Sequence, residues 1–284
     1  MTTPQRNTYA PGHDASQVKH HEWRTAENSA AYLLPHLQRA VQANPNLQLL
    51  DVGAGSGTIS ASLAKYLLPE GHVLATDISD SILARAKAHA ESQGLGVPKN
   101  ISFQKADVHA LPFADGAFDV VHAHQVLCHL ASPVDAIREM LRVTRPGGGL
   151  LALRESDMRM WCVWPEIPAL LRFHEVMVRT LVANGGQEKG GRQLVSWVLQ
   201  AGVRREDVEV SFGTWCYSSA GDRRAWGEAM IERLRTGQMR DKALEMGIAT
   251  EEEIEGMIRG WEEWIETDDA TLGIMNGEVV VRRT

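Results

Sequence analysis

A glycine-rich segment and an acid downstream of it have the spacing that points most directly to chemistry. The segment is DVGAGSG at 51–57, which follows the short apolar run at 47–52. Asp77 ends the next apolar run, at 72–77. Glycines let the backbone turn sharply and approach a ligand closely, and an acid about 20 residues further on accepts hydrogen bonds from both hydroxyls of a ribose. The pattern predicts a nucleoside-binding site.

The spacing of these glycines separates two classes of nucleotide-binding protein. The dinucleotide fingerprint is G-x-G-x-x-G, whereas this chain has G-x-G-x-G with Asp51 two residues before the first glycine. This spacing resembles motif I of the class I S-adenosylmethionine-dependent methyltransferases. A nicotinamide oxidoreductase would share the turn and the acid after the second strand, so it stays an alternative. A catalytically silent binding module of methyltransferase fold is a second one.

Four further segments resemble the same family and arrive in the family's order. They are TDIS at 76–79, ADV at 106–108, LPFADGAFDVV at 111–121 and EMLRVTRPGG at 139–148. The match is best to the branch that includes the ubiquinone and menaquinone methyltransferases, and it covers about residues 24–157. The arm and first helix, His20 to Leu37, also resemble fungal-type metabolite methyltransferases, including the gliotoxin bis-thiomethyltransferase.

The resemblance implies which residues hold the cofactor, S-adenosyl-L-methionine, whose product is S-adenosyl-L-homocysteine. Asp77 would hold the ribose, Ile78 would pack on the adenine, and Asp107 would meet the adenine amino group. Arg24 would pair with the amino-acid carboxylate of the cofactor, or would be a solvated arm residue. The full set of expected cofactor-binding residues is Arg24, Asp51, Gly53, Ala54, Gly55, Gly57, Asp77, Ile78, Asp107, Val108, His124 and Gln125.

His124 and His129 are the candidate catalytic residues. His124 lies at the carboxyl end of the strand predicted at 118–123, which is where ligands bind in open α/β sheets. His129 is either a base or a polar residue at the start of a helix. His122 and Cys128 lie nearby, but the spacing fits no common closed zinc site, so we predict no metal.

The residues after the fourth predicted strand bear on the methyl acceptor. Relatives that methylate an amide or exocyclic amine of protein or nucleic acid often carry [N/D]-P-P-[Y/F] there, and this chain has HQVL at 124–127. Its 29 basic and 36 acidic residues give a net charge of −7, which argues against a nucleic-acid partner. We therefore expect a small-molecule acceptor.

No recognisable catalytic dyad is present, which favours an acceptor that ionises by itself. A thiol has a pKa of about 8.5 and a phenol one of about 10, so a thiol is partly ionised near neutral pH without a base. The best prediction is a thiol of a secondary metabolite. O- or C-methylation of a phenolic or quinone-like metabolite is the alternative.

The elements that must position these residues alternate between strands and helices. Short apolar runs predict strands at 47–52, 72–77, 101–106, 118–123, 149–155, 208–215 and 278–282. Apolar residues at helical spacing predict helices at 25–41, 81–93, 136–143, 165–183, 191–201, 223–235 and 250–266, with another from Thr58. This order predicts an α/β fold, the Rossmann-like class I methyltransferase fold, with a seven-stranded mixed sheet, helices on both faces and an inserted helical lid.

We expect one methyltransferase domain over residues 1–284. Residues 1–45 would form an N-terminal cap arm and helix, 46–157 the cofactor-binding core, and 158–284 the substrate lid helices and the last two strands. Seven of the eight tryptophans lie after residue 157, so aromatic side chains could wall the substrate pocket. Trp161 and Trp164 are expected near the pocket mouth.

Composition limits the class of protein. Hydrophobic residues make up 44% and charged residues 23% of the 284, as in globular proteins. The three cysteines have no paired spacing, and no apolar run approaches the roughly 18 residues of a membrane span. We predict a cytoplasmic protein with reduced thiols and no membrane partner, either a monomer or a homodimer.

Overall fold

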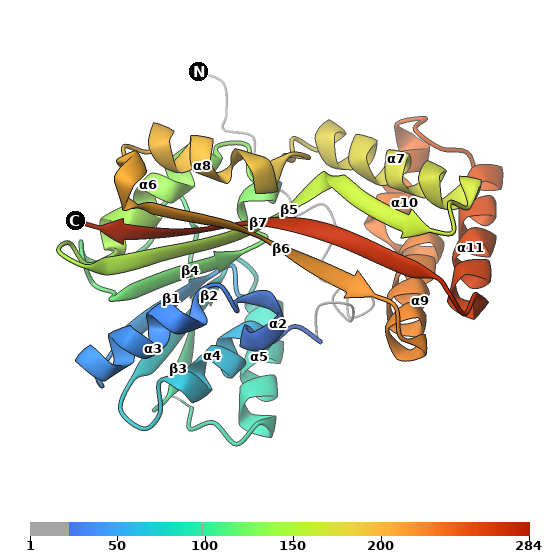
Figure 1. Cartoon of the computed structure of the whole chain (residues 1–284). Helices are drawn as coiled ribbons and strands as arrows, with labels where there is room; N and C mark the ends of the chain where they lie inside the picture. Colours follow the sequence, from blue (N-terminus) through green and yellow to red (C-terminus); the bar gives the residue numbers. More distant parts are fainter. Residues whose placement is uncertain (1–22, 98) are drawn as a thin grey trace.

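A computed structural model describes residues 23–97 and 99–284 (Figure 1). The predicted arm, with His20 and His21, lies outside the described residues. The chain forms one long sheet with helices on both faces and a group of helices at one end.

Strands and helices alternate through the first half of the chain and then give way to a run of helices. The strands are β1 (Gln48–Val52), β2 (His72–Asp77), β3 (Ile101–Lys105), β4 (Val120–His124), β5 (Gly149–Trp164), β6 (Val208–Tyr217) and β7 (Thr271–Arg283). The α-helices are α2 (Ala26–Ser29), α3 (Leu34–Ala43), α4 (Thr58–Tyr66), α5 (Asp80–Ser92), α6 (Pro133–Val143), α7 (Pro168–Ala183), α8 (Gly190–Gln200), α9 (Ala220–Thr236), α10 (Gln238–Glu245) and α11 (Glu251–Glu266). Two short 3₁₀ helices are η2 (Leu127–His129) and η3 (Arg205–Asp207).

The sheet has seven strands in the order β3-β2-β1-β4-β5-β7-β6. Strands β1 to β5 are parallel to one another, whereas β7 is antiparallel to both β5 and β6. The strand order reverses between β1 and β4, and the crevice at the carboxyl ends of such strands is where ligands bind in open α/β sheets. The predicted seven-stranded mixed sheet is confirmed.

Alternate residues of the central strands face two different hydrophobic cores. Leu49 and Val120 pack with α2 to α5 on one face, and Leu50 and Val121 pack with α6 and α8 on the other. Because both faces of the central strands are buried, β1 and β4 are mostly apolar at their amino ends. The two layers of helices lie on opposite sides of the sheet in Figure 1.

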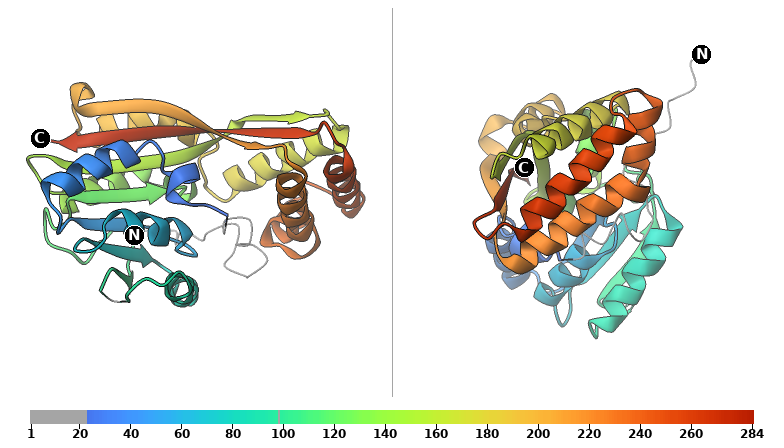
Figure 2. Two further views of the ribbon diagram at one scale, coloured as in Figure 1. Left: turned by 60° about the horizontal axis from the view of Figure 1, so that its bottom comes forward. Right: turned by 90° about the vertical axis from the view of Figure 1, so that its right-hand side faces the viewer.

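A third core lies at the far end of the sheet, where β5, β6 and β7 extend beyond the parallel strands. Helices α7, α9, α10 and α11 pack there around the fully buried Trp261 and Trp264. Figure 2 shows these helices grouped at one end of the molecule. These two tryptophans therefore build a core and do not wall a substrate pocket.

The structure corrects several predicted boundaries. The single helix expected at 25–41 is two helices, because α3 begins afresh with Pro35 in its first turn, where the missing N–H of proline costs no hydrogen bond. Strand β5 continues past the predicted end at Glu155 to Trp164, with a register shift between Ser156 and Trp161.

Two more elements differ from the prediction in the second half of the chain. Strand β7 begins at Thr271 and not at 278, because its first half pairs with the extensions of β5 and β6. Helix α10 was not predicted.

Candidate functional site

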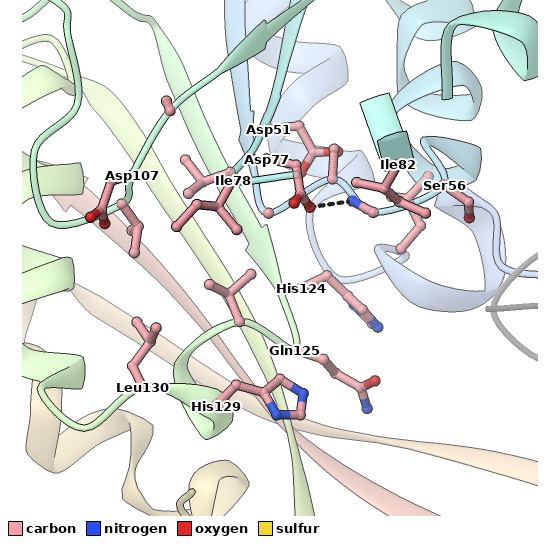
Figure 3. Close-up of a pocket in the computed structure, with 18 of the residues that line it drawn as sticks. Asp51, Ser56, Asp77, Ile78, Ile82, Asp107, His124, Gln125, His129 and Leu130 are labelled. Carbon is pink, nitrogen blue, oxygen red and sulfur yellow. Dashed lines mark hydrogen bonds between the residues drawn. The ribbon is translucent and has the colours of Figure 1, made fainter. Parts of the chain in front are cut away.

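A cavity of about 690 Å³ lies at the carboxyl ends of β1, β2 and β4. Its volume falls within the range of roughly 300–1,000 Å³ that is usual for small-molecule sites. Figure 3 shows Asp77 and Ile78 on one side of the pocket and Gln125 and His129 on the other. The lining residues are Arg24, Asp51, Val52, Gly53, Ala54, Gly55, Ser56, Thr58, Ile59, Asp77, Ile78, Ile82, Lys105, Ala106, Asp107, Val108, His109, His124, Gln125, Val126, His129 and Leu130.

The glycine-rich turn between β1 and α4 forms the floor of the pocket. Gly53, Gly55 and Gly57 all have positive φ, of 68°, 56° and 72°, which L residues with a Cβ rarely adopt. A Cβ at Gly57 would lie 2.6 Å from Ala86, and one at Gly53 would clash with Val126, whereas one at Gly55 would meet nothing within 4 Å. The turn is therefore packed against protein at both ends and open at its centre.

Asp77 lies at the tip of β2 beside this open centre. Its side chain accepts hydrogen bonds from the backbone N–H of Gly55 at 3.1 Å and of Ser79 at 3.0 Å. The residue is only 8% exposed, while the neighbouring Ile78 is 56% exposed and lines the pocket. The carboxylate is thus fixed at the pocket wall beside an exposed apolar surface.

Asp107 and Val108 line the pocket after β3. Asp107 accepts a hydrogen bond from the backbone N–H of His109 at 2.9 Å and lies 3.3 Å from its Nδ1. The Asp107 side chain is 55% exposed, so it has oxygen surface left for a ligand.

Asp51 is buried beneath the glycine turn and is engaged by protein on both oxygens. Its Oδ2 accepts a hydrogen bond from Ser60 Oγ at 2.5 Å, and its Oδ1 lies 2.7 Å from His122 Nδ1. His122 stacks with His124 along β4, with ring centroids 6.4 Å apart, as expected for residues on one face of a strand. Asp51 thereby ties β1 to α4 and β4.

The turn after β4 brings Gln125 and His129 into the pocket. Gln125 has a φ of 54°, and within residues 23–97 and 99–284 no other non-glycine residue has a positive φ. Such outliers cluster at functional sites. His129 ends the 3₁₀ helix η2 and is partly exposed where it lines the pocket.

Both candidate catalytic histidines are held neutral. Burial, with the positive charges of Arg24 and Arg154 and the neighbouring His122, lowers the pKa of His124 well below its ordinary value. Removal from water, with Arg233 and Arg24, lowers the pKa of His129 to about 4. At neutral pH each imidazole is therefore a weak proton acceptor.

Arg24 is 7% exposed and lines the pocket. Its guanidinium carbon lies 4.5 Å from the ring centre of Trp215, and that of Arg154 lies 5.0 Å from the same centre. Trp215 also lies 5.6 Å from His124, so an aromatic residue of β6 connects these groups. The alternative that Arg24 is a solvated arm residue is wrong.

Asp119 and two tryptophans of β5 lie outside the pocket lining. Asp119 has a structural role, since it accepts a hydrogen bond from the backbone N–H of Gln48 at 2.9 Å and pairs with Arg145. Trp161 and Trp164 are not near the pocket mouth: Trp161 packs on the third core, and Trp164, 55% exposed, donates to Asp269. The extension of β5 carries both away from the pocket.

The sequence interpretation missed Glu155 and the residues that complete the pocket. Glu155 is buried at the point where the predicted fifth strand ends, and its carboxylate accepts hydrogen bonds from the turn after β4. A lone acid at the carboxyl end of the apolar run at 149–155 is the signal that could have found it. The residues that line the pocket and were not predicted are Val52, Ser56, Thr58, Ile59, Ile82, Lys105, Ala106, His109, Val126 and Leu130.

The described residues contain neither a metal-binding cluster nor a membrane-spanning helix. Among residues 23–97 and 99–284, no three His, Cys, Asp or Glu side chains are grouped so that they could hold a metal ion. In the same part of the chain, no helix has the length and apolar content to cross a membrane.

Comparisons with known proteins agree with this geometry. A family model described as "Methyltransferase domain" matches residues 43–192. An uncharacterized methyltransferase of Schizosaccharomyces pombe is 30% identical over 97% of this chain and 96% of its own. A protein named "Probable methyltransferase ltbC" of Aspergillus luteorubrus is 31% identical over 98% of both chains. The chain belongs to the methyltransferase domain family, and it is an S-adenosylmethionine-dependent methyltransferase.

Other matches concern the branch and the fold. The ubiquinone/menaquinone biosynthesis C-methyltransferase UbiE of Ectopseudomonas mendocina is 38% identical over 39% of this chain and 43% of its own, which confirms the resemblance to that branch. The YcgJ protein of Bacillus subtilis has a TM-score of 0.53 at 16% identity and covers 89% of this chain and 98% of its own.

A solved structure with bound cofactor has the same fold. Haemonchus contortus phosphoethanolamine N-methyltransferase 2 in complex with S-adenosyl-L-methionine has a TM-score of 0.51 at 16% identity, over 98% of this chain and 55% of its own. The predicted class I fold and cofactor are confirmed, and family membership argues against the nicotinamide oxidoreductase.

Proposed function

We propose that this methyltransferase acts on a small-molecule acceptor that reacts as an anion, with a thiolate as the best candidate. The observation that carries the proposal is the burial of His124 and His129 beside cationic groups, which leaves both imidazoles neutral and weakly basic. A phenol with a pKa of about 10 would gain little from a base whose pKa is about 4. A thiol loses its proton to water near neutral pH and needs no such base.

The chemical character of the lining residues favours one orientation of the cofactor in the pocket. Asp77 presents a fixed carboxylate that would accept from the two ribose hydroxyls, Ile78 offers an apolar surface on which the adenine would pack, and Asp107 would accept from the adenine amino group. The space above Gly55, which a Cβ would fill, is where the chain of the cofactor would pass. Arg24 would meet the carboxylate at the far end, and its two-pronged guanidinium suits that group.

The protein has to align the acceptor and exclude water, and it need not activate the leaving group. S-adenosylmethionine supplies an activated methyl group on a sulfonium, so the leaving group needs no protonation. His124 and Gln125 would align the acceptor beside that methyl group, and the buried walls of the pocket would exclude water. Alignment and exclusion of water supply several kcal/mol of rate enhancement in such transfers.

Several broader predictions belong to the same proposal. The three cysteines are free thiols, which agrees with a cytoplasmic protein, and the net charge of −7 disfavours a nucleic-acid partner. We also propose a role in secondary metabolism, with residues 158–284 supplying the lid over the acceptor within a single domain. A monomer and a homodimer both fit this function.

The pH dependence of single-turnover methyl transfer tests the proposal. Matched aryl thiol and phenol acceptors would be compared with the wild-type protein over a range of pH. We expect transfer to the thiol, with a rate that follows the thiolate fraction. Transfer to the phenol alone would refute the thiol and support O-methylation. Binding of S-adenosylhomocysteine without turnover of any acceptor would support the silent binding module.

A further inference from the structure

The turn at 125–129 connects β4 to α6 and supplies one side of the pocket wall. Gln125 and His129 face the pocket, and Val126 lies between the pocket and the glycine turn. Because Gln125 holds a positive φ, the turn needs support from its surroundings to keep this shape. That support comes from the neighbouring strand, β5.

The carboxylate of Glu155 accepts hydrogen bonds from three successive backbone N–H groups of this turn. Its Oε1 lies 2.9 Å from the nitrogen of Val126 and 2.7 Å from that of Leu127, and its Oε2 lies 3.2 Å from that of Cys128. The first N–H groups of a helix have no partner within it, so an acid at this position caps η2. Glu155 is fully buried and belongs to no ion pair in the described part of the chain.

The residues on either side of Glu155 hold the first residue of the same turn. The carbonyl oxygen of Arg154 accepts from the backbone N–H of Gln125 at 2.8 Å. The side-chain amide of Gln125 donates to Ser156 Oγ, which in turn donates to Asn276 Oδ1 of β7 at 2.8 Å. Three consecutive residues of β5 thus take up the N–H donors of residues 125–128.

The turn at 125–129 also contacts the glycine turn between β1 and α4. The side chain of Val126 packs so closely on Gly53 that a Cβ at Gly53 would clash with it. A movement of the turn would therefore displace Val126 from the first glycine of the glycine turn as well as Gln125 and His129 from the pocket wall. The buried carboxylate of Glu155 therefore supports both the pocket wall at 125–129 and its contact with the glycine turn.

We propose that Glu155 is a positioning residue for methyl transfer, whose carboxylate holds the turn at 125–129 against the glycine turn. The inference rests on the proposed placement of the cofactor and does not depend on the identity of the acceptor. The turn keeps its shape only while both carboxylate oxygens accept, because three N–H donors converge on them. A neutral side chain at position 155 has one strong acceptor oxygen and presents hydrogen atoms to the remaining donors.

The surroundings of Glu155 explain why its ionised form is sensitive to pH. Burial raises the pKa of Glu155 to about 7, although hydrogen bonds from Cys128 and from the turn oppose that rise. The other titratable groups that face it are the Cys128 thiol on η2 and the Tyr32 phenol before α3, and burial keeps both neutral. Helix α8 approaches Glu155 with the backbone of Gly190 and Gly191.

Titration of the whole chain with S-adenosylhomocysteine tests the proposal, with Glu155→Gln compared to the wild type. We expect the dissociation constant of Glu155→Gln at about pH 8 to rise by about tenfold. Wild-type affinity should fall as the pH decreases through about 7, since Glu155 takes up a proton, whereas the affinity of Glu155→Gln should stay constant over this range. A role in folding alone would not give that difference in pH profile.

Asp157→Asn is the matched control, because Asp157 is also fully buried on β5. It accepts from the N–H of Arg159 and pairs with Arg192, and none of these residues lines the pocket. We expect its affinity and its pH profile to match the wild type. Where Glu155→Gln does not fold, Ser156→Ala releases the Gln125 amide and should weaken binding by about threefold.

Three outcomes would overturn the proposal. Wild-type affinity for both Glu155→Gln and Ser156→Ala would show that the turn does not depend on β5. An equal loss in Asp157→Asn would show a general effect of removing a buried charge. Failure of the wild type to bind S-adenosylhomocysteine would overturn the cofactor placement together with this inference, whereas methylation of a phenol and not a thiol would leave it intact.

Discussion

The backbone N–H of Gly55 donates to the carboxylate of Asp77 at 3.1 Å across the tips of β1 and β2. This bond joins the centre of the glycine turn to the acid that the sequence places 22 residues later. It also fixes the carboxylate beside the only part of the turn where a Cβ would meet no protein atom among the described residues. The carboxylate of Asp77 and the open space at Gly55 therefore lie side by side in the pocket.

Asp77→Ala should weaken binding of S-adenosylmethionine by about 1.5–3 kcal/mol, or roughly 10-fold to 150-fold, because a charged acceptor for two ribose hydroxyls is lost. Titration calorimetry checks this. Asp135→Ala, which removes an exposed acid on α6 that pairs with Arg138, should bind normally. An unchanged dissociation constant for Asp77→Ala would refute the assignment of the ribose to this residue.

Gly55→Val should abolish cofactor binding while the fold survives. The valine side chain would enter open space in the pocket, so its cost to the fold is the strain of a positive φ, on the order of 1–2 kcal/mol. Gly94→Val is the matched control, since Gly94 has a φ of 73° and open space around it but lies after α5, outside the pocket. Circular dichroism and calorimetry on both variants decide the point, and retained binding by Gly55→Val would contradict it.

The cofactor half of the site could be predicted because its chemistry is local in the sequence. The glycine turn and Asp77 each follow directly from a strand, so their places at the edge of the sheet are determined by the strand order alone. Asp51 was expected to bind the cofactor, and the structure shows its oxygens engaged by Ser60 and His122. A contact between β1 and β4 depends on sheet pairing, which periodicity does not report.

The second half of the chain was harder to predict because long-range pairing determines its elements. Strand β5 continues through Arg159 and Met160, which have no alternating pattern, because β7 pairs with it on the far side of a register shift. The break before α3 had a local signal, Pro35, that the apolar periodicity obscured. Aromatic side chains were expected in the pocket wall, but burial of their large apolar surface places Trp261 and Trp264 in the third core.

Trp215 should report ligand binding by fluorescence, and Trp161 and Trp164 should not. The Trp215 ring lies 5.6 Å from His124 and donates from Nε1 to the carbonyl oxygen of Asn28 at 3.1 Å, so it contacts groups that border the pocket. Trp215→Phe should remove most of the change on adding S-adenosylhomocysteine, while the Trp161→Phe/Trp164→Phe double variant should retain it. Loss of the fluorescence change in the double variant, with the change retained in Trp215→Phe, would show that Trp161 and Trp164 lie near the ligand.

The buried Glu155 should make the protein less stable as the pH rises. Its folded-state pKa is raised from the ordinary 4.5 to about 7, so the fold binds the proton more tightly than the unfolded chain does. The stability gained in this way is fully present below about pH 4.5 and is lost as the pH rises to about 7. Glu155→Gln should therefore unfold at a higher temperature than the wild type at about pH 8, and this difference should vanish near pH 4.5. A variant less stable than the wild type at every pH would contradict the prediction.

The two pocket histidines should leave no titration near pH 6.5 in the rate of methyl transfer. Burial and nearby cations lower the pKa of both, to about 4 for His129, so neither imidazole titrates near the ordinary value of about 6.5. With a thiol acceptor and saturating cofactor, the single-turnover rate should rise with the thiolate fraction and level off near the pKa of the thiol. His124→Ala should slow transfer by about tenfold, or about 1.4 kcal/mol, through poorer alignment and without moving that pKa. A loss of 10²-fold to 10⁴-fold that appears only with hydroxyl acceptors would instead identify a general base and end the thiol hypothesis.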